Sequence, residues 1–220
     1  IAAEDIYTAD GTVRAAGGDT VDTIITDESG YAETEPLYLG KYEIKEISAP
    51  YGYVVNEESK FAELTYSGQD IAVNDAVNCT MNNEYQRINI RFSKSMESDR
   101  TFGTGMKNEY RNVRFGLFAA EDITAADGTS IPENGLIAEI GLNDDMTAEF
   151  TEKLPFSRYY VQEISTDESY VLNGEKYLVN FEYTGQAHPS VDIDCGTFHN
   201  TIKRGDIMGM KINENGEPLE

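Results

Sequence analysis

The amino-acid sequence predicts an all-β protein. Apolar and polar residues alternate with a period of two in segments such as 42–46 and 88–96, which places successive side chains on opposite faces of a strand. Turn dipeptides such as Asp10-Gly11 separate these short segments. No long segment has the apolar spacing of a helix. Short strands at this spacing are typical of a β-sandwich or a partly open barrel.

The individual strands follow from the same alternation. In 88–96 the apolar side chains share one face with Lys94, and in 42–46 Tyr42 and Ile44 share one face with Glu46. Further short strands are expected at 20–25, 61–66, 70–77, 177–183 and 190–195.

The sequence repeats itself at a fixed offset of 117 residues. The segment AAEDIYTADGT at 2–12 recurs as AAEDITAADGT at 119–129, and YEIKEIS at 42–48 recurs as YYVQEIS at 159–165. Chance does not maintain one offset at several separated places, so the chain is interpreted as a tandem array.

The repeat also predicts where the domains begin and end. Residues 1–87 form a first repeat without its opening strand, and residues 88–203 form a complete second repeat. Residues 204–220 would be the opening strand of a third repeat. The second repeat contains an insertion near 97–113, rich in glycine, asparagine and charge, which we expect to be an exposed loop.

Composition excludes several classes of partner and site. The chain has a formal net charge of −23 and a pI near 4.3. A protein of this charge is expected to repel nucleic acid and anionic membranes. No apolar run is long enough for a transmembrane helix. Cys79 and Cys195 match neither a disulfide framework nor a zinc site, and Cys79 is expected to be a buried, inert thiol. Acidic clusters such as Asp144-Asp145 are interpreted as solvated faces, so no metal or cofactor is expected.

Polar side chains lie at positions where the strand pattern calls for apolar ones. In the second repeat these are Lys94, Glu163 and Asn200, and in the first repeat Glu46 and Asn83 take the equivalent places. Each residue also has a simpler explanation. The lysine could be solvated, the carboxyl could be hydrogen-bonded to tyrosines, and the amide could satisfy backbone groups at a strand end. Because an isolated buried charge is costly, three such groups in one core favour a common explanation.

That explanation is an amide exchange. Burial is expected to lower the pKa of Lys94, which leaves a neutral, nucleophilic amine. The glutamate is expected to donate a hydrogen bond to the asparagine carboxamide and to provide a proton route to the leaving ammonia. The product is one Lys–Asn bond, formed once per molecule, so the chain is not expected to be a turnover enzyme.

The segment YEIKEISAPYGY at 42–53 resembles the glutamate-containing motif, or E-box, of collagen-adhesin B-type domains in Gram-positive adhesins and pilins. The resemblance implies tandem immunoglobulin-like or prealbumin-like β-sandwich domains. It also implies an isopeptide bond from Lys94 to Asn200, with Glu163 as the catalytic residue. Glu46, Asn83 and Lys211 would be the equivalent positions of the incomplete repeats. The second repeat departs from the motif at 166–170, where Thr-Asp-Glu-Ser-Tyr replaces Ala-Pro-Tyr-Gly-Tyr.

The function implied by this resemblance is structural. The chain would be a stalk or spacer of a cell-wall-anchored surface protein, located outside the cell, with neighbouring repeats of the same parent as partners. Head-to-tail association through residues 205–214 is a further hypothesis. The alternative is a binding module that binds a protein or glycan ligand through the 97–113 insertion or a tyrosine-rich surface. Many more repeats in the parent protein would favour the stalk.

Overall fold

The computed structural model describes residues 1–70, 77–125 and 127–218. Within these ranges the strands dominate, and the one helical element is a short 3-10 turn, Glu109–Asn112. The chain forms two compact units: unit 1 comprises residues 1–86 and 183–189, and unit 2 comprises 87–182 and 190–220. The all-β prediction is therefore confirmed. A helix of the length and apolarity that a membrane crossing requires does not occur in the described part of the chain.

Unit 1 is built of short antiparallel strand pairs. β1 (Ile6–Tyr7) pairs with β2 (Val13–Ala15), β3 (Gly40–Ile44) pairs with β5 (Lys60–Leu64), and β4 (Tyr53–Val54) pairs with β6 (Glu84–Tyr85). Its buried core is small. Ala2, Ile6 and Tyr42 form it, with a few half-buried aliphatic side chains packed around them. The Tyr42 hydroxyl donates a hydrogen bond of 2.6 Å to the backbone oxygen of Tyr38.

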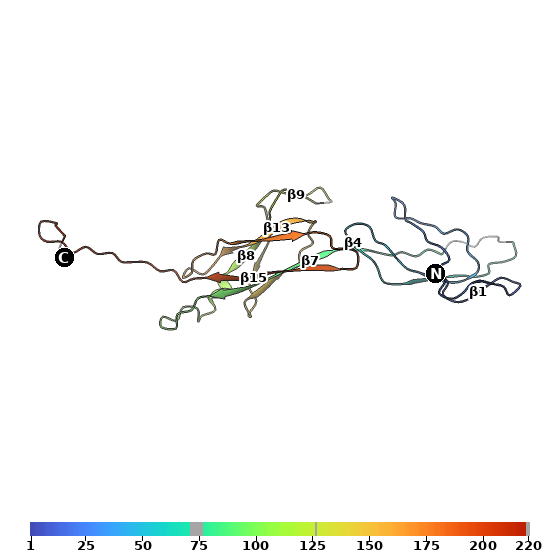
Figure 1. The fold of residues 1–220 in the computed structure, drawn as a ribbon, viewed down its shortest axis with the longest axis horizontal. Helices are drawn as coiled ribbons and strands as arrows, with labels where there is room; N and C mark the ends of the chain where they lie inside the picture. Colours follow the sequence, from blue (N-terminus) through green and yellow to red (C-terminus); the bar gives the residue numbers. More distant parts are fainter. Residues whose placement is uncertain (71–76, 126, 219–220) are drawn as a thin grey trace. The chain divides into compact units, whose positions relative to one another are not determined.

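Unit 2 is a sandwich of two sheets. The first sheet has the antiparallel order β11 (Leu136–Gly141), β8 (Arg114–Ala119), β13 (Ser157–Ser165) and β14 (Lys176–Phe181). The second has the order β12 (Thr147–Phe150), β7 (Arg87–Met96) and β15 (Ser190–Asn200), with β15 parallel to β7. Figure 1 shows β8 and β13 on one side of this unit and β7 and β15 on the other. A small hairpin of β9 (Ile123–Thr124) and β10 (Ser130–Ile131) completes the unit.

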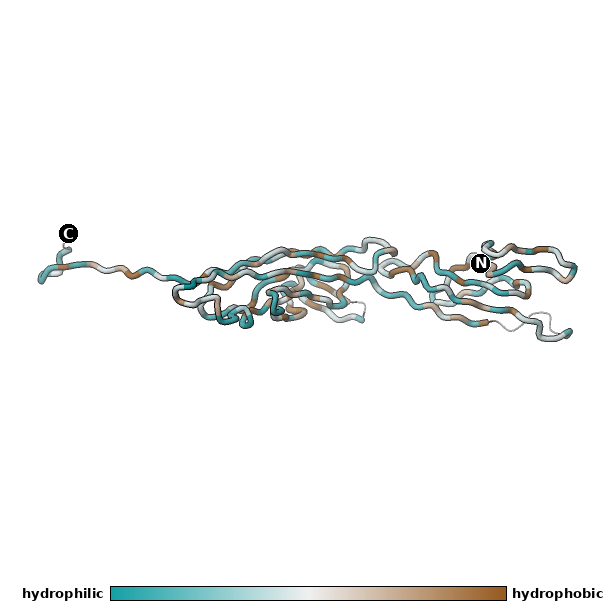
Figure 2. Tube along the Cα trace, turned by 90° about the horizontal axis from the view of Figure 1, so that it is seen from below, coloured by the Kyte–Doolittle hydropathy of each residue, from teal (hydrophilic) through white to brown (hydrophobic). Residues whose placement is uncertain are grey.

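The core of unit 2 lies between these two sheets. Along β7, every second side chain from Ile88 to Lys94 is buried, as the period of two predicts. Phenylalanine rings join the sheets: the Phe115 ring lies 4.5 Å from Phe92 and 4.9 Å from Phe198, measured between centroids. Figure 2 shows hydrophobic and hydrophilic residues alternating along the strands. Truncating such a buried ring to alanine typically costs about 3–5 kcal/mol of stability.

The strand pairings of the two units correspond at the offset seen in the sequence. Tyr42 lies opposite Ala62 in unit 1, and Tyr159 lies opposite Val179 in unit 2. Both members of the second pair follow those of the first by 117 residues. The two tyrosines also bond alike, since the Tyr159 hydroxyl donates to the backbone oxygen of Pro155 at 2.6 Å.

Some of the expected strands are absent. Residues 20–25 are not a strand, so this prediction was wrong. Val21 packs on the small core of unit 1, whereas Ile24 and Ile25 are 44% and 91% exposed, so the apolar side chains have no common surface to cover. The expected strand at 70–77 lies, apart from its first and last residues, outside the described residues.

Two burial predictions also need correction. The insertion was expected to be exposed as far as Val113, but this side chain is fully buried in the core of unit 2 beside β8, and the exposed segment ends before it. Cys79 was expected to be buried and is exposed, because it lies in a segment of unit 1 without a strand partner. Cys195 on β15 is buried.

Candidate crosslink site

The two sheets of unit 2 bring together the three polar residues singled out in the second repeat. Lys94 lies on β7 and Asn200 ends β15, and these two strands are neighbours in one sheet. Glu163 lies on β13, in the facing sheet. All three side chains point into the core and are between 1% and 4% exposed.

The three groups contact one another directly. The Lys94 Nζ donates a hydrogen bond to the Asn200 Oδ1 at 2.5 Å and lies 3.2 Å from the Glu163 Oε1. The Asn200 Nδ2 donates to the same Oε1 at 2.8 Å. One carboxylate oxygen therefore touches both the amine and the amide nitrogen. Such an oxygen can take a proton from one nitrogen and deliver it to the other.

Burial disfavours the charged form of Lys94. Loss of hydration lowers the pKa of Lys94, and the nearby charge of Glu163 opposes this shift only in part. The amine therefore loses its proton more readily than an exposed lysine does. The Phe115 ring, whose centroid lies 5.7 Å from Nζ, contributes to the apolar surroundings. A neutral amine in hydrogen-bond contact with a carboxamide can act as a nucleophile.

The glutamate acts on the carboxamide differently from what we expected. Rather than donating to the carbonyl oxygen, the Glu163 carboxylate accepts from the nitrogen of Asn200. Its other oxygen accepts a hydrogen bond of 2.6 Å from the backbone nitrogen of Asn173. In this arrangement the Asn200 carbonyl oxygen contacts the lysine, and the carboxylate contacts the amide nitrogen.

Asn173 and Thr166 are site residues that the sequence analysis missed. Asn173 holds the carboxylate of Glu163 through its backbone nitrogen, and its side chain donates to the backbone oxygen of His199 at 3.1 Å. The repeat offset contains a signal for it, because Asn56 in unit 1 is its equivalent and likewise donates its backbone N–H to Glu46, at 2.5 Å.

Unit 1 holds a similar pair without a lysine. The Asn83 Nδ2 donates to the two carboxylate oxygens of Glu46 at 2.8 and 2.7 Å, and to the backbone oxygen of Val54 at 3.0 Å. The lysines of residues 1–86 make ion pairs elsewhere: Lys41 with Glu4, Lys45 with Glu43 and Lys60 with Glu58. Among the described residues no amine therefore contacts this pair.

Lys211 lies apart from any glutamate–asparagine pair. Residues 203–211 form no strand, and Ile207 and Met208 are 100% and 95% exposed. Beyond this segment, Ile212 forms an isolated β-bridge with Pro218. The segment is drawn as an extended trace after β15 in Figure 1.

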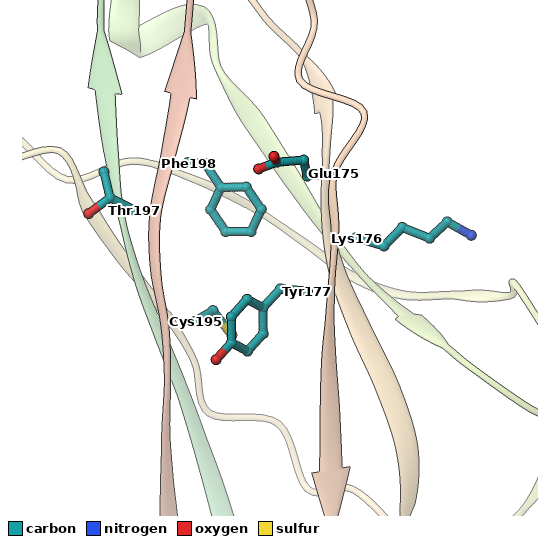
Figure 3. Close-up of a pocket in the computed structure, with 6 residues that line it drawn as sticks. All are labelled: Glu175, Lys176, Tyr177, Cys195, Thr197 and Phe198. Atoms are coloured by element: carbon teal, nitrogen blue, oxygen red, sulfur yellow. The ribbon is translucent and has the colours of Figure 1, made fainter.

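A hollow of about 370 Å³ lies between β14 and β15. Glu175, Lys176, Tyr177, Cys195, Thr197 and Phe198 line it. Figure 3 shows the Tyr177 ring beside Cys195, with Lys176 pointing away. Burial raises the pKa of the Cys195 thiol to about 12, so this thiol stays protonated and unreactive.

The acidic clusters are engaged with cations or amides of the protein. Asp144 pairs with Arg111 at 2.9 Å, and Asp192 accepts a hydrogen bond from Asn89 at 2.8 Å. In the described ranges, no group of three or more histidine, cysteine, aspartate or glutamate side chains is arranged to hold a metal ion.

Comparison with known proteins agrees with this architecture. Residues 3–77 match the SpaA family of domains, described as a prealbumin-like fold domain. The TIE protein of Bacillus anthracis superimposes over 90% of this chain, with a TM-score of 0.51 and 20% sequence identity. Residues 3–77 carry a prealbumin-like domain. The prealbumin-like fold that the resemblance implies is therefore confirmed for this part of the chain.

Other structural matches are weaker. The minor pilin GBS52 of Streptococcus agalactiae matches 84% of this chain and 70% of its own, with a TM-score of 0.37 and 13% identity. A variant of the major pilin BcpA of Bacillus cereus matches 89% of this chain and 93% of its own, with a TM-score of 0.31 and 10% identity. The prealbumin-like chain spans 34% of the Bacillus anthracis protein. No curated protein sequence matches it.

Proposed function

We propose that this chain is a structural stalk or spacer segment of a pilin or adhesin on the surface of a Gram-positive cell, anchored in the cell wall. Its second unit would be stabilised by an intramolecular isopeptide bond between Lys94 and Asn200. The observation that carries the proposal is the contact of Lys94, Glu163 and Asn200 inside the core. The prealbumin-like domain and the motif at 42–53 support a place among extracellular surface proteins.

The reaction that this contact supports is an amide exchange. The neutral Nζ of Lys94 attacks the side-chain carbonyl carbon of Asn200, and the carbonyl oxygen takes up negative charge. Glu163 accepts a proton from Nζ and passes it to Nδ2, because its Oε1 contacts both nitrogens. The bond from the carbonyl carbon to Nδ2 then breaks and ammonia leaves. One amide replaces another and no co-reactant is required, so each molecule reacts once.

Intact-mass measurement of the purified chain tests the proposal. The mass should be lower than the sequence mass by one ammonia, and proteolysis should yield a branched peptide that joins Lys94 to Asn200. Glu163→Gln should restore the full mass, since it removes the proton carrier. The matched control is Glu46→Gln in unit 1, which should leave the ammonia loss unchanged. An unmodified wild-type mass after prolonged incubation would reject the bond.

Unit 1 supports a related proposal about partners. The Glu46–Asn83 pair has the arrangement of an acceptor for a lysine-bearing strand. Segment 205–214 carries Lys211, which is the equivalent of Lys94 at the offset of 117 residues. We infer that an opening strand of this type adds beside the pair. Between two copies of this chain the contact would run head to tail.

A binding role is the second candidate, and one observation favours it. The insertion of unit 2 presents Phe102 and Met106, which are 81% and 63% exposed. Large apolar side chains exposed on a loop can serve as contact residues for a ligand. Replacing Phe102 and Met106 together by alanine should abolish attachment to a protein or glycan ligand if this role is correct, and should leave the ammonia loss unchanged.

A further inference from the structure

The carboxamide of Asn200 is held by more groups than the lysine and the glutamate. Its nitrogen carries two hydrogens: one is donated to the Glu163 Oε1 at 2.8 Å and the other to the Thr166 Oγ1, also at 2.8 Å. Its oxygen accepts from Lys94. A rotation of the amide by half a turn would place its oxygen against the Glu163 carboxylate, an unfavourable contact between two acceptors. Thr166 is therefore one of the two groups that hold the amide nitrogen in place.

An irregularity in the sheet brings the threonine to the site. In a regular strand, residues 163 and 166 would point to opposite faces, because they are three positions apart. The pairing of β13 with β8 shifts between Glu163 and Ser165, as in a β-bulge. The extra residue of the bulge reverses the alternation, so that the side chains of Glu163 and Thr166 point to the same face. Both therefore contact Asn200.

Unit 1 offers an internal comparison. Ala49 is the equivalent of Thr166 at the offset of 117 residues, and it has no hydroxyl. There the amide nitrogen of Asn83 donates to both oxygens of Glu46 and to the backbone oxygen of Val54. The hydroxyl contact is therefore particular to unit 2, where a lysine faces the amide.

We propose that Thr166 is a positioning residue for the amide exchange and that it also stabilises the departing nitrogen. This inference rests on the proposed function. As Nδ2 receives the proton from Glu163, it gains positive charge and becomes a stronger hydrogen-bond donor. The bond to the neutral hydroxyl then strengthens between the ground state and the transition state, and such an interaction accelerates the reaction. Ammonia departs, and the new amide keeps the carbonyl oxygen.

The rate of ammonia loss tests this role. The full chain is made by cell-free translation, and its intact mass is followed with time. Thr166→Val keeps the shape and removes the hydroxyl, so the rate should fall about tenfold, the effect of one hydrogen bond in the transition state. Thr166→Ser should react at nearly the wild-type rate. Thr151→Val is the matched control at an exposed position and should have no effect.

The outcomes separate this role from the proposed function. If the wild type loses ammonia and Thr166→Val loses it equally fast, the role of Thr166 is refuted and the crosslink stands. Equal slowing in Thr166→Ser and Thr166→Val would also refute it, because the hydroxyl would then be irrelevant. A wild type that never loses ammonia refutes both proposals.

A second measurement does not require the reaction. In a Lys94→Met background, where no nucleophile remains, nuclear magnetic resonance follows solvent exchange of the Asn200 side-chain amide hydrogens. Adding Thr166→Val should speed this exchange about tenfold, since one of the two hydrogen bonds of the amide is lost. If the valine variant does not fold, Thr166→Ala takes its place. Unchanged exchange would overturn the positioning role.

Discussion

Preventing the proposed crosslink of unit 2 should lower the stability of this unit by a large and calculable amount. The double variant Lys94→Met, Glu163→Gln removes the nucleophile and its charged partner together, so that no buried charge is left without a counter-charge. Lys94 and Asn200, the residues of the proposed bond, are 106 positions apart in the chain. Closing a loop of that length stabilises a fold by about 5 kcal/mol, if the chain-entropy relation for disulfides applies to this bond. For a unit of about 130 residues this corresponds to a fall in the melting temperature of roughly 20 °C.

Differential scanning calorimetry, with intact mass measured on the same samples, provides the assay. The transition of unit 2 should move down while that of unit 1 stays in place, because the substitutions lie within the core of unit 2. Full mass in the double variant together with a melting point within a few degrees of the wild type would refute the entropy argument. Loss of ammonia in the double variant would show that the bond joins other residues.

Four further predictions concern the same molecule. The rate of ammonia loss should rise with pH as the amine of Lys94 is deprotonated. It should level off below pH 10.5, the ordinary lysine pKa, because burial lowers the pKa of Lys94. Time-resolved mass spectra at several pH values check this. Unit 1 should melt before unit 2 in calorimetry, because its buried core is far smaller and no lysine contacts its amide; a single shared transition would contradict this. Concentrated protein should give covalent multimers on denaturing gels, abolished by Lys211→Ala or Asn83→Ala, whereas a monomer band alone would exclude the head-to-tail bond. Iodoacetamide should label the exposed Cys79 in the folded chain and leave the buried Cys195 untouched until denaturant is added.

The sequence alone determined the fold class and the equivalence of positions 117 residues apart. Alternation with a period of two is a local property of strands, so it could be read without knowledge of their partners. The same alternation marked Lys94 as an inward-facing residue, since its place on β7 depends only on its neighbours in the chain. The proposed crosslink itself stays a prediction.

Only the tertiary structure decided which atoms meet. Lys94, Glu163 and Asn200 come from three strands in two facing sheets, and their distances depend on how those sheets pack. Thr166 could not be foreseen, because simple alternation points it away from Glu163 and a shift in strand pairing reverses that direction. The exposure of Cys79 was misjudged for a related reason: an alternating segment is buried only where another surface covers it, and that surface lies elsewhere in the chain.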